Sequence, residues 1–199
     1  MAKTVYYTAT TLDGFLADPE NSLQWLFEVE EGEATGGALD TAAFLSTIGA
    51  MAMGATTYAW LLAHEQLAEH PGKWREWYGE RPCFVFSHRE LPLPAGAPVR
   101  LVRGDVRPLH AELVAAAGGR DVWLMGGGEL VGQFADHGLL DEIVATVAPV
   151  TLGAGAPLLP RRLSADRLRL RALGRLGQFA QLVYDVRPPA AGPVPPAAQ

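Results

Sequence analysis

Short apolar runs alternate with longer segments of helical periodicity through most of the chain. The apolar runs that we expect to form strands are residues 4–10, 50–53, 83–87, 99–102 and 122–125. The segments that we expect to form helices are residues 39–47, 56–69, 109–117 and 129–137. Strands that alternate with helices are typical of a mostly parallel sheet whose crossover helices cover both faces. The pattern therefore predicts an α/β protein.

The pattern changes after residue 142, where extended segments follow one another. These segments are residues 143–150, 168–173 and 178–186, and no helix of ordinary length separates the last two. Such an ending favours an antiparallel hairpin at the edge of the sheet. The final stretch is rich in proline, which cannot donate to a strand ladder. We therefore expect one domain over residues 1–187 and a disordered or extended tail over residues 188–199.

Composition and charge narrow the classes of partner. A chain of 199 residues, 49% of them hydrophobic, can bury one full core. The net charge is -6 at pH 7 and no basic run is present, so we expect no nucleic-acid partner. The single cysteine, Cys83, lies in an apolar run, which fits a reducing compartment. No signal-peptide pattern or membrane-spanning stretch is visible, so we expect a cytoplasmic protein without a membrane partner.

The strongest local motif is Gly126-Gly127-Gly128, between a buried strand and a helix that begins near Glu129. A glycine turn at this point lets backbone amides approach an anion at the positive end of the helix, as in a phosphate site. Three glycines can equally form a tight turn that binds nothing, so both interpretations stay open. The motif comes too late in the chain to be the fingerprint of an ordinary Rossmann dehydrogenase.

Two other strand ends carry groups that suit an anion. The first is Met53-Gly54-Ala55-Thr56-Thr57, where a strand meets a helix, although a simple N-cap explains this segment as well. The second is Ser87-His88-Arg89, a polar and cationic cluster that follows the strand over residues 83–86. Ligands of open α/β sheets bind at the carboxyl ends of the strands. Three such ends together favour one extended ligand that carries phosphate.

The order of these motifs resembles the superfamily of dihydrofolate reductases and RibD C-terminal reductase domains. The segments that carry the resemblance are Thr8-Ala9-Thr10-Thr11-Leu12-Asp13-Gly14-Phe15-Leu16-Ala17, Met53-Gly54-Ala55-Thr56-Thr57-Tyr58, Phe86-Ser87, Gly126-Gly127-Gly128-Glu129-Leu130 and Ala148-Pro149-Val150-Thr151-Leu152-Gly153-Ala154-Gly155. Together they extend over nearly the whole chain up to Arg187. The resemblance implies a three-layer αβα fold of the dihydrofolate reductase type, with a mostly parallel central sheet and a C-terminal antiparallel hairpin.

The resemblance also implies where a nicotinamide cofactor would bind. Ala9 and the Asp13-Gly14 pair would lie at the nicotinamide. The residues implied near the cofactor phosphates are Gly54, Thr56 and Thr57. Those implied around the adenosine ribose and its 2′-phosphate are Ser87, His88 and Arg89. Those implied at the pyrophosphate and the nicotinamide ribose are Gly127, Gly128, Glu129 and Leu130, next to Gly126 in the same turn.

One residue departs from the family pattern. The family commonly has arginine directly after the glycine of the second motif, whereas this chain has Ala55. The change removes a guanidinium that would bind phosphate through two hydrogen bonds. NADPH is the expected cofactor and NADH stays possible, with His88 and Arg89 as the groups that would compensate.

Two carboxylates are candidates for contact with the substrate. Asp40 approximates the place of the carboxylate that binds the pterin in folate reductases, but an aspartate at a helix start also serves as an N-cap. Asp13 would bind substrate in a RibD-like site, but an Asp-Gly pair is also what a tight turn uses. Both alternatives stay open for each residue. The histidines lack ligand-like spacing, so we predict no metal site.

The resemblance implies an NAD(P)H-dependent reductase that acts on a small heterocycle by hydride transfer. The substrate would resemble a ribosylaminopyrimidine, as in riboflavin biosynthesis, or a pterin or folate. The extended segment over residues 148–159 favours the RibD type. The alternative is a non-catalytic nucleotide-binding or interaction protein that retains the fold, which Ala55 favours. We also expect a homodimer, because RibD-like reductases commonly associate and apolar strands lie near the C-terminal edge.

Overall fold

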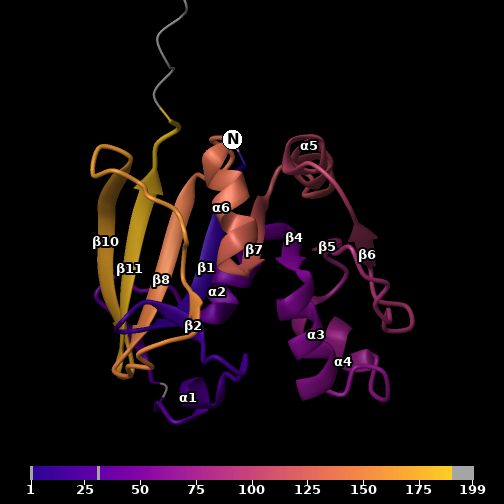
Figure 1. The fold of residues 1–199 in the computed structure, drawn as a ribbon, viewed down its shortest axis with the longest axis horizontal. Helices are drawn as coiled ribbons and strands as arrows, with labels where there is room; N and C mark the ends of the chain where they lie inside the picture. The colour runs from indigo at the N-terminus through magenta and orange to yellow at the C-terminus, as the bar shows by residue number, and fades with distance from the viewer. Residues whose placement is uncertain (1, 31, 190–199) are drawn as a thin grey trace, which may run out of the picture.

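One nine-stranded sheet forms the centre of the protein (Figure 1). The computed structural model describes residues 2–30 and 32–189. The strands of this sheet are β1 (Thr4–Thr11), β3 (Ala34–Thr35), β4 (Ile48–Gly54), β5 (Cys83–Phe86), β6 (Val99–Val102), β7 (Asp121–Gly126), β8 (Glu142–Ala148), β10 (Leu168–Leu176) and β11 (Phe179–Val186). Their spatial order is β3-β10-β11-β8-β1-β7-β4-β5-β6, and the pairs from β8 to β6 are all parallel. The predicted α/β class is therefore confirmed.

Helices cover both faces of this sheet. The covering helices are α2 (Thr41–Thr47), α3 (Ala55–His64), α4 (Gly72–Tyr78), α5 (Val106–Ala116) and α6 (Gly128–Asp136). Buried side chains of α5 and α6 belong to one core cluster, and those of α2, α3 and α4 belong to another. The short helix α1 (Gln24–Phe27) packs instead into a third, smaller cluster through Trp25. The sheet separates the first two clusters, which confirms the predicted three-layer arrangement.

Strand alternation explains why one sheet can support two cores. In β7, Val122 and Leu124 pack into the core under α5 and α6, whereas Trp123 packs into the core under α2, α3 and α4. In β1, Tyr6 and Val5 divide between the two cores in the same way. Successive side chains of a strand point to opposite faces, so a strand that is apolar at every position suits a sheet covered on both sides.

The predicted C-terminal hairpin is present and forms part of the sheet near one of its edges. Strands β10 and β11 pair antiparallel, and β11 pairs antiparallel with β8. The hairpin is not outermost, because the two-residue strand β3 pairs with β10 beyond it. A separate ladder of β2 (Phe15–Ala17) and β9 (Ala156–Pro157) connects the segment after β1 to the segment after β8.

Two helix boundaries differ from the sequence-based expectation by three residues or more. Helix α3 ends at His64, whereas the pattern predicted a helix to residue 69; Gln66 adopts a φ of 52°, which a right-handed helix cannot continue. Helix α5 begins at Val106 rather than residue 109, because Asp105 caps it by accepting a 2.8 Å hydrogen bond from the Arg107 N–H.

Two further expectations concern the tail and the membrane. Residues 190–199 of the expected tail lie outside the described residues. Within residues 2–30 and 32–189, no helix is both long and apolar enough to cross a membrane.

Candidate functional site

Two adjoining cavities lie at the carboxyl ends of the parallel strands. The first has a volume of about 550 Å³ and is lined by the ends of β1 and β7, by β2, by the loop and helix after β2, by the start of α3, and by residues 156–160. The second has a volume of about 270 Å³ and is lined by the ends of β4, β5 and β6 and by the start of α6. Thr56, Gly127 and Glu129 line both cavities, so the two adjoin at these residues.

Most of the residues expected at a cofactor site line one cavity or the other. Those in the first cavity are Ala9, Thr56, Thr57, Gly126, Gly127, Gly128 and Glu129. Those in the second are Gly54, Thr56, Ser87, His88, Gly127, Glu129 and Leu130. Segments that are far apart in the sequence thus meet at one edge of the sheet, as expected for ligands of an open α/β fold.

Two helix N-termini meet at the boundary between the cavities. Helix α3 has Gly54 as its N-cap and helix α6 has Gly127, and glycine has no side chain that could accept from the first-turn N–H groups. Such groups are available to a bound anion, which the helix dipole also attracts. The boundary therefore has the chemistry of a phosphate or pyrophosphate site.

The glycines after β7 serve different purposes. A Cβ added at Gly127 would meet no atom within 4 Å, whereas one at Gly128 would lie 2.4 Å from the Pro157 carbonyl oxygen and 2.6 Å from that of Leu158. Gly128 is thus required by the close approach of the chain around β9. Gly127, which joins Gly126 through a cis peptide bond, leaves open space on the side where a ligand would approach.

Glu129 is the acidic group at the boundary, and Arg161 holds it. The Arg161 guanidinium donates to both carboxylate oxygens of Glu129, at 2.6 and 2.9 Å, and its Nε donates to Asp136 at 2.8 Å. These hydrogen bonds hold the pKa of Glu129 below its usual value and raise that of Arg161. Two carboxylates and one guanidinium leave the triad with a net negative charge.

The second cavity contains a cation that the sequence analysis missed. Arg103 follows β6 and lines this cavity together with His88 and Ser87. It forms an ion pair with Glu90. The rule that singled out the end of β5 applies equally to the end of β6, so the sequence carried the signal. Arg89, in contrast, lines neither cavity in the described part of the chain.

Ser87 shapes the turn at the end of β5. Its buried hydroxyl donates to the Arg89 carbonyl oxygen at 2.7 Å and accepts from the Arg89 N–H at 3.0 Å. These bonds fix the backbone of the turn beside the second cavity. The side chain of Arg89 is exposed.

The two expected carboxylates lie outside the cavities. Asp40 is the N-cap of α2 and accepts from the Ala43 N–H at 2.7 Å. Asp13 accepts from the Thr11 hydroxyl and from the backbone N–H groups of Leu152 and Gly153, at 3.0 and 2.7 Å, so it joins two loops. The Thr11 hydroxyl is the main cause of a lowered Asp13 pKa. Both positions fit the structural roles, helix cap and turn.

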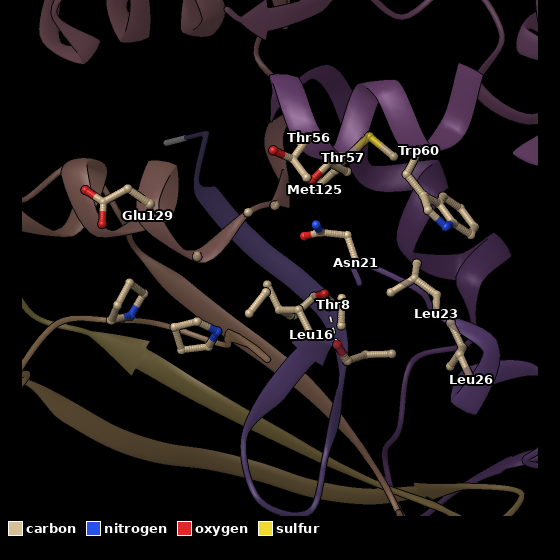
Figure 2. Close-up of a pocket in the computed structure, with 18 of the residues that line it drawn as sticks. Thr8, Leu16, Asn21, Leu23, Leu26, Thr56, Thr57, Trp60, Met125 and Glu129 are labelled. Carbon is tan, nitrogen blue, oxygen red and sulfur yellow. Dashed lines mark hydrogen bonds between the residues drawn. The ribbon is translucent and has the colours of Figure 1, made fainter. Parts of the chain in front are cut away.

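The first cavity is lined largely by apolar side chains. Figure 2 shows Leu16, Leu23, Leu26, Trp60 and Met125 around an open space into which Asn21 extends. Thr8 in β1 and Thr57 in α3 add hydroxyl groups. Asn21 was not singled out by the sequence analysis, because its place depends on how the loop after β2 folds back over the sheet.

Comparisons with known proteins agree with this fold. The sequence model of the family described as the RibD C-terminal domain matches residues 2–180. The chain is 32% identical over 189 residues to the uncharacterized protein YwjB of Bacillus subtilis strain 168, and the match covers 92% of this chain and 97% of the relative. Among solved structures, it is similar to a putative riboflavin biosynthesis protein from Shewanella sp. PV-4, with a TM-score of 0.71 and 28% identity over 94% of this chain and 99% of that one.

A more distant structural match supports the fold alone. RibD of Acinetobacter baumannii superposes with a TM-score of 0.61 at 18% identity, and the match covers 94% of this chain and 58% of the longer protein. The expected dihydrofolate reductase-like fold of a RibD C-terminal domain is confirmed.

Proposed function

The chain belongs to the RibD C-terminal domain family, and on that premise we propose that it is an NAD(P)H-dependent reductase of a small heterocycle. The observation that carries the proposal is the meeting of two glycine-capped helix N-termini where a smaller cavity at the ends of β4, β5 and β6 adjoins a larger, mainly apolar one. A dinucleotide needs an anion site between two pockets, one for each of its ends. The two cavities supply this arrangement.

The residues present fit NADPH along its whole length. The second cavity would hold the adenosine end, with His88 and Arg103 beside the 2′-phosphate. The first-turn N–H groups of α3 and α6 would bind the pyrophosphate. The open space beside Gly127 allows the backbone to come close to it. Ala9 would lie against the nicotinamide in the first cavity.

Arg103 supplies a positive charge to the cavity in which Ala55 replaces the arginine common in the second motif. Ala55 supplies no charge at the start of α3, but it lies in the second cavity together with Arg103. The helix N-termini attract the pyrophosphate without a guanidinium, and Arg103 lies beside the 2′-phosphate end. A preference for NADPH over NADH is therefore part of the proposal, with Arg103 rather than Arg89 as its main determinant.

Reduced nicotinamide supplies the hydride in this class of reaction, water supplies the proton that completes the reduction, and the protein supplies orientation and an apolar surrounding. The apolar side chains of Leu16, Trp60 and Met125 would exclude water from the face of the substrate. Thr8, Thr57 and Asn21 would fix the substrate through hydrogen bonds. A substrate held in this way lies next to Ala9, where the nicotinamide is proposed to bind.

A non-catalytic nucleotide-binding protein is the second candidate. The observation that favours it is the position of Asp13 and Asp40, which serve a loop clasp and a helix cap and do not reach the first cavity. On this alternative the fold would bind the cofactor and reduce nothing.

Titration of the protein with NADPH and NADH tests the proposal, followed by assay for oxidation of the cofactor with a dihydropterin and with a ribosylaminopyrimidine. We expect NADPH to bind more tightly than NADH and one heterocycle to be reduced. NADPH binding without turnover of any such substrate would favour the non-catalytic alternative. A folded protein that binds neither cofactor would contradict both.

A further inference from the structure

The first cavity differs in charge from the second. Among the described residues that line it, Glu129 is the only one that carries a charge, and it belongs to the net negative triad with Arg161 and Asp136. Both cationic candidates, His88 and Arg103, line the second cavity instead, where Arg103 is paired with Glu90. Glu129 lines the second cavity as well, so its charge does not distinguish the two. The difference is that no described lining residue of the first cavity is a cation, and a phosphate buried there would lose hydration that no ion pair replaces.

The helix N-termini do not change this conclusion for the substrate. They lie where the two cavities adjoin, and the proposed function assigns them to the cofactor pyrophosphate. A second phosphate, on the substrate, would bind in the rest of the first cavity, where uncharged polar side chains such as Thr8 and Thr57 stand among apolar ones. The apolar side chains are Leu16, Leu23, Leu26 and Trp60. Apolar and aromatic walls suit a flat, uncharged ring system.

Asn21 provides a polar contact in this apolar surrounding. Its φ of 61° places it in the left-handed region, which asparagine tolerates better than most residues. The loop is fixed there because the Asn21 N–H donates to the Asp18 carbonyl oxygen at 3.0 Å, while the Asp18 carboxylate accepts from the N–H groups of Glu20 and Ser22 at 3.0 and 2.7 Å.

The side chain of Asn21 extends toward the middle of the cavity, between Thr57 on one side and Leu16 on the other (Figure 2). Asn21 is an exposed residue, and its carboxamide forms no hydrogen bond with another residue among 2–30 and 32–189, so it is open to solvent and to a ligand in the cavity. A carboxamide offers a donor and an acceptor side by side. The complementary group is an amide-like ring edge, in which an N–H stands next to a carbonyl.

We propose that the substrate of this cavity is an uncharged planar heterocycle without a phosphate group, and that the Asn21 carboxamide binds its amide-like edge. The proposal rests on the proposed function, since it assumes that the cofactor occupies the second cavity and the boundary. It makes the first cavity a site for free pterin-like or pyrimidine-like rings and excludes their phosphorylated ribosyl forms.

A matched pair of probes tests the exclusion of phosphate. Dihydroneopterin and dihydroneopterin monophosphate share one ring and differ only in the phosphate. Each is titrated into the protein with and without NADPH, and quenching of tryptophan fluorescence reports binding because Trp25 and Trp60 line the cavity. We expect the monophosphate to bind at least about tenfold more weakly. Equal or tighter binding of the monophosphate, or no binding of either probe, overturns the proposal.

Variants of the loop test the role of Asn21. Asn21→Gly keeps the left-handed backbone and removes the carboxamide, whereas Glu20→Ala changes an exposed neighbour that does not line the cavity. We expect Asn21→Gly to weaken dihydroneopterin about tenfold. We expect both variants to bind NADPH as the unmodified protein does, and Glu20→Ala to bind the pterin normally. Unchanged pterin affinity in Asn21→Gly overturns the assignment.

Failure of the proposed function has a different signature. A protein that binds dihydroneopterin but not NADPH would contradict the reductase while leaving the substrate class supported. A protein that binds NADPH but prefers the phosphorylated probe would contradict the substrate class alone.

Discussion

At the scale of single residues, Gly127 and Gly128 separate ligand binding from folding. A side chain at Gly127 would project into open space on the ligand side, so Gly127→Val should leave the fold intact and weaken NADPH about tenfold or more. Gly128→Val would meet the carbonyl oxygens of Pro157 and Leu158, so it should destabilise the protein by roughly 1–3 kcal/mol. Calorimetric titration and denaturant unfolding of both variants measure the two effects. Normal NADPH affinity in a folded Gly127→Val protein would count against the cofactor site.

Arg103 and Arg89 form a second pair for comparison. If Arg103 binds the 2′-phosphate, Arg103→Ala should weaken NADPH about tenfold and change NADH little, because only NADPH carries that group. Arg89→Ala is the control, since its exposed side chain lines neither cavity. Dissociation constants of both cofactors for both variants show which arginine binds the 2′-phosphate. A larger loss in Arg89→Ala would restore the role that the sequence first suggested for Arg89.

At the scale of elements, His110 links α5 to β1. Its Nε2 lies 2.8 Å from the Thr4 hydroxyl, and burial lowers the pKa of the imidazole below its ordinary value of 6.5. The unfolded chain therefore binds the proton more readily, so this contribution to stability is present above pH 6.5 and is lost as the pH falls below it.

A pH series of unfolding measurements checks this linkage. We expect the free energy of unfolding to fall between about pH 7 and pH 5 in the unmodified protein, and to fall less in His110→Gln. Identical pH profiles for the two proteins would show that His110 does not contribute.

The elements also show what a sequence pattern can reveal. The strand over residues 99–102 has the predicted bounds. A short apolar run is typical of a strand in a sheet that is covered on both faces. Helix α4 and strands β3 and β9 were not foreseen. Helix α4 mixes Lys73 and Arg75 with buried Trp74 and Tyr78 in seven residues, too few for a clear period. Strands β3 and β9 have two residues each and form only by pairing with strands that are far away in the sequence.

The same limit applies to the candidate site. Local patterns identified the glycine turn and the ends of β4 and β5, because a strand end followed by glycine or hydroxyl residues is visible within a few positions. Asn21 reaches the cavity only because its loop folds over the ends of β1 and β7, which no neighbouring residue reveals. Asp13 and Asp40 were ambiguous, because an aspartate that caps a helix or forms a turn looks the same in a sequence as one that binds a ligand.

At the scale of the whole molecule, the homodimer stays a prediction. Leu170 and Leu173 of β10 are 53% and 59% exposed, so apolar side chains are accessible on this side of the sheet. Light scattering over a wide range of protein concentration should give twice the monomer mass. A mass of one chain throughout that range would refute the dimer.

The residues shared by the two cavities link the two ligands thermodynamically. Because Thr56, Gly127 and Glu129 line both cavities, a ligand that orders these residues in one cavity changes the binding free energy of the ligand in the other. Reciprocity then requires that the factor by which NADPH alters pterin affinity equals the factor by which the pterin alters NADPH affinity. We expect cooperative binding with a factor of about five or more, measured by titrating each ligand at saturation of the other. A factor of one would mean that each cavity takes its ligand independently, and the order of binding would then be random.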